Sequence, residues 1–257
     1  MLDRDRAIRV AASGPTGGAI VLPLAALVAL TVLTQLASVA YTSASAFDQV
    51  WLRSTVALLL VTTPLAALGL RLGSRIGLGT PLLSALLAGR QGSLRQLRGT
   101  AARAAAWGLS VGGLLWALRI VTEPNLPPAL PELGHRGVVG GLLVALAAAV
   151  GEEVWLRLGV MTIVAWLLIR VRAGSGLTPS IARVAITVAA VAFGAMHLPQ
   201  LAAAGAATGV GVAATLAGNM LVGVLCGWLY WRHGLLAAMF AHFFVDLVLH
   251  VLPALVG

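Results

Sequence analysis

The sequence predicts an all-α membrane protein, a polytopic transmembrane bundle of seven to eight helices with one amphipathic helix at the membrane surface. The composition is the first observation behind this class. Hydrophobic residues fill 60% of the 257 positions and charged residues only 10%, whereas a soluble domain of this length carries about 25% charged residues. A soluble protein needs a polar surface, and a helix surrounded by lipid does not. We therefore expect an integral membrane protein.

Long apolar runs, the second observation, define the expected spans, because about 20 apolar residues in a helix cross the hydrocarbon core. The stretch 138–170 is too long for one straight span, so it is expected to tilt, to kink near Gly151 or Gly159, or to form two helices. The segment 81–97 alternates Leu with basic residues, which is typical of an amphipathic helix lying on the membrane. The expected spans are 18–41, 51–70, 101–121, 138–170, 181–198, 212–231 and 234–254.

All 17 basic residues are arginine, and their distribution predicts the orientation. With a cytoplasmic N-terminus and seven crossings, 13 of them lie on the inner side, and only Arg53, Arg119 and Arg136 lie on the outer side. This bias follows the positive-inside rule and favours an N-terminus in the cytoplasm and an outward C-terminus. The expected location is a bacterial plasma membrane. The arginines form no stacking platform with aromatic residues, so no nucleic acid is expected as a partner.

Acidic and histidine side chains inside the expected spans are the third observation. An ionisable group at the bilayer centre costs roughly 2.5 kcal/mol or more, so it persists when it pairs or takes part in chemistry. Glu153 and Arg157 are four residues apart and share a helix face, which predicts a structural ion pair. Glu152 is rotated by about 100° from that face and is left for reaction. The residues concerned are Glu152, Glu153, His197, His242 and Asp246.

Their depth in the membrane gives a second check on these residues. The rise of a helix places Glu152, His197 and Asp246 about 20–27 Å from the inner boundary, and His242 about 15 Å from it. Residues from three separate spans thus fall in one broad layer, as an active site requires. His242 and Asp246 lie four apart on one face, and Phe193 repeats this spacing to His197.

Two further residues are expected to pack rather than react. Asn219 lies on one face with Gly223 and Gly227, and small residues favour close contact between helices. Asn219 is therefore expected to form an interhelical hydrogen bond. Cys226, the one cysteine, is expected to be a small packing residue.

Three motifs follow one another in successive apolar helices. They are EExxxR from Glu152 to Arg157, FxxxH from Phe193 to His197, and HxxxD from His242 to Asp246. In this order they resemble the CPBP family, the CAAX protease and bacteriocin-processing group that includes the Rce1-type prenyl-protein proteases. The resemblance covers about residues 138–250. It suggests N-terminal transmembrane helices and the surface helix over 1–136, and a catalytic core over 137–257, within one membrane domain.

The resemblance implies an intramembrane endopeptidase whose partners are the bilayer and a protein or peptide substrate. Glu152 would be the general base that activates water, and His197 would help to hold that water. His242 and residue 246 would stabilise the oxyanion, with Glu153 and Arg157 in support. The prenyl-protease branch commonly has Asn where this chain has Asp246. An ionised Asp cannot donate a hydrogen bond, so Asp246 is protonated, orients His242 or binds a cation.

Alternatives remain at this point for the mechanism and for the function. No cofactor is expected, although Glu, His and Asp are also zinc ligands; the sequence has no HExxH pair on one helix, which favours the metal-free reaction. A non-catalytic membrane scaffold or chaperone of the same fold is the second candidate function. A proton-coupled transporter is the third, because buried carboxylates and histidines are typical of transporters as well.

Overall fold

The computed structural model describes residues 18–42, 47–129, 137–172 and 176–256, and within these ranges every regular element is a helix. Seven helical stretches among them are long and apolar enough to cross a membrane, which confirms the predicted all-α transmembrane bundle. The seven are Ile20–Tyr41, Trp51–Ile76, Ser93–Asn125, Gly137–Val171, Pro179–Ala203, Gly209–His233 and Leu235–Val256.

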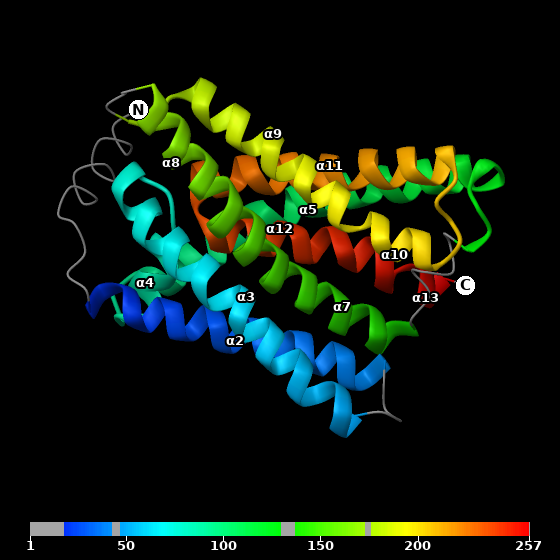
Figure 1. Ribbon diagram of the computed structural model, residues 1–257, viewed down its shortest axis with the longest axis horizontal. Coiled ribbons are helices and arrows are strands. Elements are labelled where there is room, and N and C mark those ends of the chain that lie inside the picture. Colours follow the sequence, from blue (N-terminus) through cyan, green and yellow to red (C-terminus); the bar gives the residue numbers. More distant parts are fainter. Residues whose placement is uncertain (1–17, 43–46, 130–136, 173–175, 257) are drawn as a thin grey trace.

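The first two spans form a hairpin that supports the fourth (Figure 1). Helices α2 (Gly18–Thr42) and α3 (Phe47–Ile76) pack against each other, and α2 also packs along α7 (Gly137–Glu152). Each of α2 and α3 contains an internal proline, which membrane helices tolerate because neighbouring groups satisfy the freed backbone. The hairpin therefore lies on one side of α7.

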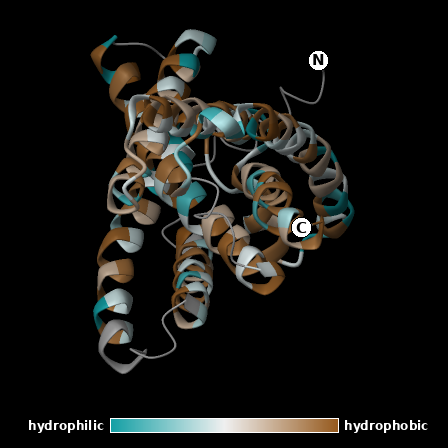
Figure 2. Cartoon of the chain, turned by 90° about the vertical axis from the view of Figure 1, so that its right-hand side faces the viewer, coloured by the Kyte–Doolittle hydropathy of each residue, from teal (hydrophilic) through white to brown (hydrophobic). Residues whose placement is uncertain are grey.

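The remaining spans lie on the other side of α7 and pack in two close pairs. Helix α5 (Ser93–Thr122) packs on α12 (Leu235–Asp246), and α9 (Pro179–Met196) packs on α11 (Gly209–His233). Hydrophobic residues cover most of the length of the helices in the bundle (Figure 2), and large apolar side chains on α2, α3 and α5 are exposed. These exposed side chains form the surface that lipid would cover.

The fourth span is one continuous helical stretch that changes its winding. Between α7 and α8 (Thr162–Val171), residues Glu153–Met161 form a π-helix, η2. The structure thus places the predicted irregularity in the region between Gly151 and Gly159, and the option of two separate helices is wrong. A second π-helix, η3 (Leu247–Val251), follows α12 directly. π-Helical turns are rare and frequently mark functional sites.

The amphipathic helix predicted over 81–97 is wrong in its length. Helix α4 ends at Leu87, and α5 begins at Ser93, eight residues before the predicted third span. Gly89 and Gly92 between them have φ angles of 62° and 80°, a left-handed conformation that glycine adopts without steric cost and that ends a helix. Leucines of α4 (Pro81–Leu87) are buried against the bundle, so part of its apolar face packs on protein.

The close approach of α5 to α12 depends on a glycine. A Cβ atom at Gly108 would lie 2.4 Å from the carbonyl oxygen of Ala241, a distance at which one helix has to move. Small residues allow such close backbone contact in membranes, where packing rather than hydrophobic burial holds helices together. Because Ala241 precedes His242 in α12, this contact also fixes the position of that histidine.

We predict opposite effects of alanine at two glycines of α5. Gly108→Ala should lower the free energy of unfolding by about 1–3 kcal/mol through overpacking. Gly113→Ala, whose Cβ would meet nothing within 4 Å, should leave it unchanged or raise it by up to about 1 kcal/mol, because alanine favours the helix. Thermal unfolding of the purified protein in detergent compares the two. Equal melting midpoints for both variants would contradict the described packing of α5 on α12.

Candidate active site

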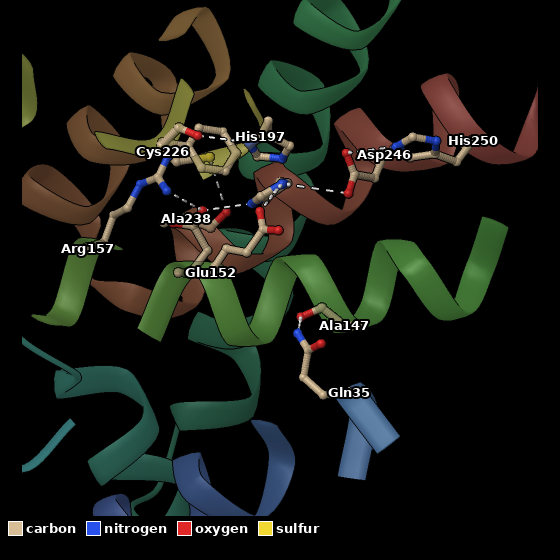
Figure 3. Close-up of polar contacts among 12 residues, drawn as sticks. Gln35, Ala147, Glu152, Arg157, His197, Cys226, Ala238, Asp246 and His250 are labelled. Atoms are coloured by element: carbon tan, nitrogen blue, oxygen red, sulfur yellow. Dashed lines mark hydrogen bonds and ion pairs between the residues drawn. The ribbon is translucent and has the colours of Figure 1, made fainter. Parts of the chain in front are cut away.

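His242 lies among three carboxyl groups contributed by two spans (Figure 3). Its Nδ1 is 2.8 Å from Oε1 of Glu153, a direct hydrogen bond in which the ring N–H donates to the carboxylate. On the opposite side of the ring, Nε2 is 3.7 Å from Oε2 of Glu152 and 3.6 Å from Oδ2 of Asp246. The fold therefore brings the predicted acids of both motifs to a single imidazole.

Glu153 forms the predicted ion pair with Arg157. The carboxylate and guanidinium are 3.1 Å apart, and both side chains have no exposed surface. The guanidinium also lies over the ring of Phe193, 4.7 Å from its centroid, where a cation–π contact is favourable. Glu153 thus has a wider role than the ion pair predicted from the sequence, because the same oxygen also accepts the hydrogen bond from His242.

The two adjacent glutamates differ in exposure. Glu152 retains 17% of its side-chain surface, whereas Glu153 retains none. Glu152 is the last residue of α7, and Glu153 begins the π-helix η2. One carboxyl group can therefore meet a water molecule or a substrate, while its neighbour is enclosed and engaged by Arg157 and His242. This difference agrees with the separate roles predicted for the two residues.

His197 lies directly after α9 and is held by its own helix. Its Nδ1 is 2.8 Å from the carbonyl oxygen of Phe193, so the ring donates there and Nε2 is the nitrogen left to face the site. The Phe193 ring meets both imidazoles edge-on, at centroid distances of 5.0 Å to His197 and 5.6 Å to His242. Phe193 thus links Arg157 and the two histidines, a role that the FxxxH spacing alone did not reveal.

Two residues without a predicted catalytic role also lie at the cluster. His250 Nε2 is 4.0 Å from Oδ1 of Asp246; the four-residue spacing from Asp246, which repeats that from His242, was a signal for it. Cys226 is fully buried, and its Sγ is 3.8 Å from the carbonyl oxygen of Ala238. No sequence signal separates Cys226 from an ordinary packing cysteine.

Asn219 makes a different contact from the predicted one. Its Nδ2 donates to the carbonyl oxygen of Thr215 in the same helix at 2.8 Å, so the expected interhelical hydrogen bond is not formed among the described residues. The close helix contact predicted beside it is present, because a Cβ atom at Gly223 would lie 2.8 Å from Cα of Ala190 in α9.

Three buried side chains of this site carry potential metal ligands. Donor atoms of Glu153, Cys226 and His242 all lie within 4.8 Å of one another, and all three residue types bind zinc. This set differs from the predicted zinc ligands, which included Asp246. The guanidinium of Arg157, 3.1 Å from Glu153, already supplies positive charge there and would repel a divalent cation. The residues therefore fit a metal ion poorly.

The N-terminal hairpin holds the helix that carries the glutamates (Figure 3). Gln35 of α2 donates to the carbonyl oxygen of Ala147 at 2.9 Å. This contact needs Gly151, since a Cβ there would lie 2.6 Å from the amide nitrogen of Gln35. From the other helix of the hairpin, Thr62 accepts a 2.9 Å hydrogen bond from the indole of Trp155. Both contacts flank Glu152 in the sequence.

The family comparison agrees with the resemblance seen in the motifs. Residues 134–248 match a family model described as type II CAAX prenyl endopeptidase Rce1-like. The matched range contains the glutamate pair, Arg157, both histidines and Asp246, and it ends before His250. Searches of curated proteins and of solved structures found no match. The description of the matched family is that of an endopeptidase, an enzyme that hydrolyses peptide bonds.

We predict that the two glutamates differ strongly in their effect on stability. Glu153→Gln leaves Arg157 buried without its counter-charge and should lower the free energy of unfolding by about 3–5 kcal/mol. Glu152→Gln changes a partly exposed group with no direct hydrogen bond and should lower it by about 1 kcal/mol or less. Thermal unfolding in detergent measures both variants against the unchanged protein. A loss from Glu152→Gln as large as that from Glu153→Gln would contradict the assigned ion pair.

Proposed function

We propose that this protein, whose residues 134–248 form a domain of the Rce1-like type II CAAX prenyl endopeptidase family, is a glutamate-dependent intramembrane endopeptidase. Its substrates would be membrane-associated proteins or peptides. The observation that carries the proposal is the placement of His242, which Glu153 holds through Nδ1 while Nε2 faces Glu152. In a hydrolysis, a partly exposed carboxylate can activate the attacking water, and a fixed imidazole opposite it can bind the oxygen of the peptide carbonyl.

Glu152 is the proposed general base. Its Oε2 lies 3.7 Å from Nε2 of His242, which is longer than a direct hydrogen bond, and we propose that a water molecule is shared between the two groups. The carboxylate would take a proton from this water, and the resulting hydroxide would attack the carbonyl carbon of the scissile peptide. Glu152 would then return the proton to the leaving amine.

His197 and His242 are the proposed groups that bind the water and the oxyanion. His197 has Nδ1 engaged by its own helix, so its Nε2 can hold the water by accepting a hydrogen bond from it. His242 donates from Nδ1 to Glu153, so it would donate to the oxyanion from Nε2 as the doubly protonated imidazolium, whose charge the carboxyl groups around it balance. Such a preorganised donor typically contributes 100- to 1000-fold to turnover. Asp246 contacts His242 at 3.6 Å and His250 at 4.0 Å. Among its three possible roles, this placement supports an orienting carboxylate between two imidazoles.

The arginine distribution supports the remaining part of the proposal, which is orientation. With ten arginines of the described residues at one end of the bundle, the positive-inside rule favours a cytoplasmic position for that end and for the N-terminus. The proposed location is the plasma membrane of a bacterium. The substrate would then reach Glu152 within the bilayer, from a lipid-anchored or membrane-spanning segment.

We predict that Glu152→Ala abolishes cleavage. Loss of a general base should reduce turnover by about 100- to 10,000-fold while the amount of folded protein stays the same. Mass spectrometry of new protein termini in membranes compares cells that carry the unchanged protein with cells that carry this variant. Glu123→Ala is the control. It removes an exposed acid directly after the C-terminal end of α5 and should retain every cleavage.

The same variant separates the protease from a scaffold. Suppose that Glu152→Ala returns a deletion strain to the phenotype of the unchanged strain, and that the new protein termini are the same with both proteins. The protein then acts without hydrolysis, and the proposed function is wrong. Proton-dependent flux through liposomes that contain Glu152→Ala would identify a transporter instead.

We predict that metal removal leaves cleavage unchanged. Treatment with a chelator should not alter turnover of the purified protein. Cys226→Ala deletes one of the three potential ligands and should change turnover by less than about tenfold. A tenfold loss is the lower end of what is seen when a metal site is disturbed. Elemental analysis of the active protein accompanies both measurements. Stoichiometric bound zinc, together with activity that is lost on chelation and restored by zinc, would contradict water activation by Glu152 alone. It would indicate a metal-dependent mechanism.

A further inference from the structure

A cleft of about 40 Å³ lies between α5, α11 and α12, away from the glutamate cluster. Its polar lining residues, called here the polar rim, are Thr100, Arg103 and His233. Its apolar lining residues, called the apolar wall, include Trp107, Leu229 and Ala237. Arg103 and His233 are exposed side chains, whereas Thr100 is buried. The cleft thus combines hydrogen-bond donors with an apolar surface.

The helix ends place this cleft at the level of the membrane surface. His233 is the last residue of α11, and after one glycine α12 begins at Leu235, so the chain turns back at this point. Helix α5 has 30 residues and is about 45 Å long, which exceeds the hydrocarbon thickness of about 30 Å. The surplus allows Arg103, ten residues after the start of α5, to lie level with the turn. Trp107 below it is of the residue type enriched at membrane interfaces.

The positive charge of the cleft is not neutralised by the described protein. Arg103 and Arg232 both act electrostatically on His233, and Arg232 lies over the ring of Trp231 at 4.4 Å. None of the ion pairs between described residues involves these three side chains. The described acidic side chains lie within the glutamate cluster or, for Glu123, at the opposite end of α5. Among the described residues no acidic side chain completes this site, and an anionic ligand could do so.

Other arginines at the same end show why the cleft differs from ordinary surface charge. The ends of α3 and α8, the start of α9 and helix α4 gather at this end of the bundle (Figure 1), and Arg98 is exposed there but does not line this cleft. Arginine binds phosphate through paired N–H groups, and basic pockets between membrane helices on the cytoplasmic side bind lipid headgroups. The cleft adds a hydroxyl and an apolar wall to the charge.

We propose that the cleft formed by Thr100, Arg103, Trp107 and His233 binds the phosphate group of an anionic phospholipid, with the phosphate at the polar rim and the glycerol and first acyl carbons against the apolar wall. The bound lipid bridges α5 to the α11–α12 turn, and so it stabilises the packing of the helix that carries His242. This site is independent of the proteolytic function, since none of its residues touches the glutamate cluster.

The test measures thermal unfolding of the full-length protein in lipid nanodiscs. Phosphatidylcholine alone is the reference, a mixture of phosphatidylglycerol and phosphatidylcholine supplies the anionic lipid, and inorganic phosphate added to phosphatidylcholine nanodiscs supplies the free ion. Saturating anionic lipid should raise the melting midpoint by about 5 °C or more. Arg103→Gln and, as a second variant, His233→Gln should lose most of this rise. Arg98→Gln, at the same end but outside the cleft, should keep it.

Each outcome decides the proposal. A rise with phosphatidylglycerol that depends on Arg103 or His233 but not on Arg98 supports a lipid phosphate site. A rise with inorganic phosphate that depends on the same residues supports the phosphate site with the free ion as its source. A rise that persists in both cleft variants, one that Arg98→Gln removes equally, or no rise with either anion overturns the proposal.

Discussion

The ion pair between Glu153 and Arg157 is the interaction on which the rest of the site depends. Two fully enclosed charges in a membrane helix are costly unless they compensate each other, and here the carboxylate has a second contact with the ring of His242. The hydrogen bond fixes a proton on Nδ1 and the direction of the ring, as a carboxylate does for a metal-bound or catalytic histidine. The reactive side of His242 is thereby turned toward Glu152 and Asp246.

The winding of the helices allows two adjacent glutamates to serve different purposes. The π-helix that begins at Glu153 follows directly after Glu152, and the second π-helix follows directly after Asp246. Each thus begins immediately after one of the two acids that face Nε2 of His242. The α2–α3 hairpin, which lies outside the family match, supports this region through Gln35 and Thr62. The N-terminal spans are therefore part of what holds the glutamates in place.

Much of this arrangement follows from local sequence rules, and the rest depends on contacts that such rules do not contain. The spans follow from apolar length, and the Glu153–Arg157 pair from four-residue spacing, because both are properties of one helix. The bond from Glu153 to His242 joins residues 89 positions apart, so only the packing of α12 on α7 reveals it. Spacing also placed Asn219 on the correct face but could not tell an interhelical bond from one to its own helix. The surface helix was predicted too long because the leucine pattern continues past Gly89 and Gly92, whose left-handed backbone breaks it.

The most direct test of a carboxylate base at position 152 is chemical rescue of the purified protein. A small carboxylate such as formate can occupy the space that Glu152→Ala leaves and take the proton from water in its place. Cleavage of a membrane-anchored peptide is measured with and without formate in Glu152→Ala and in His242→Ala. We predict that Glu152→Ala is inactive without formate and regains part of its turnover with formate. The turnover of His242→Ala should not rise with formate. Cleavage by Glu152→Ala without formate, at the rate of the unchanged protein, would contradict this prediction.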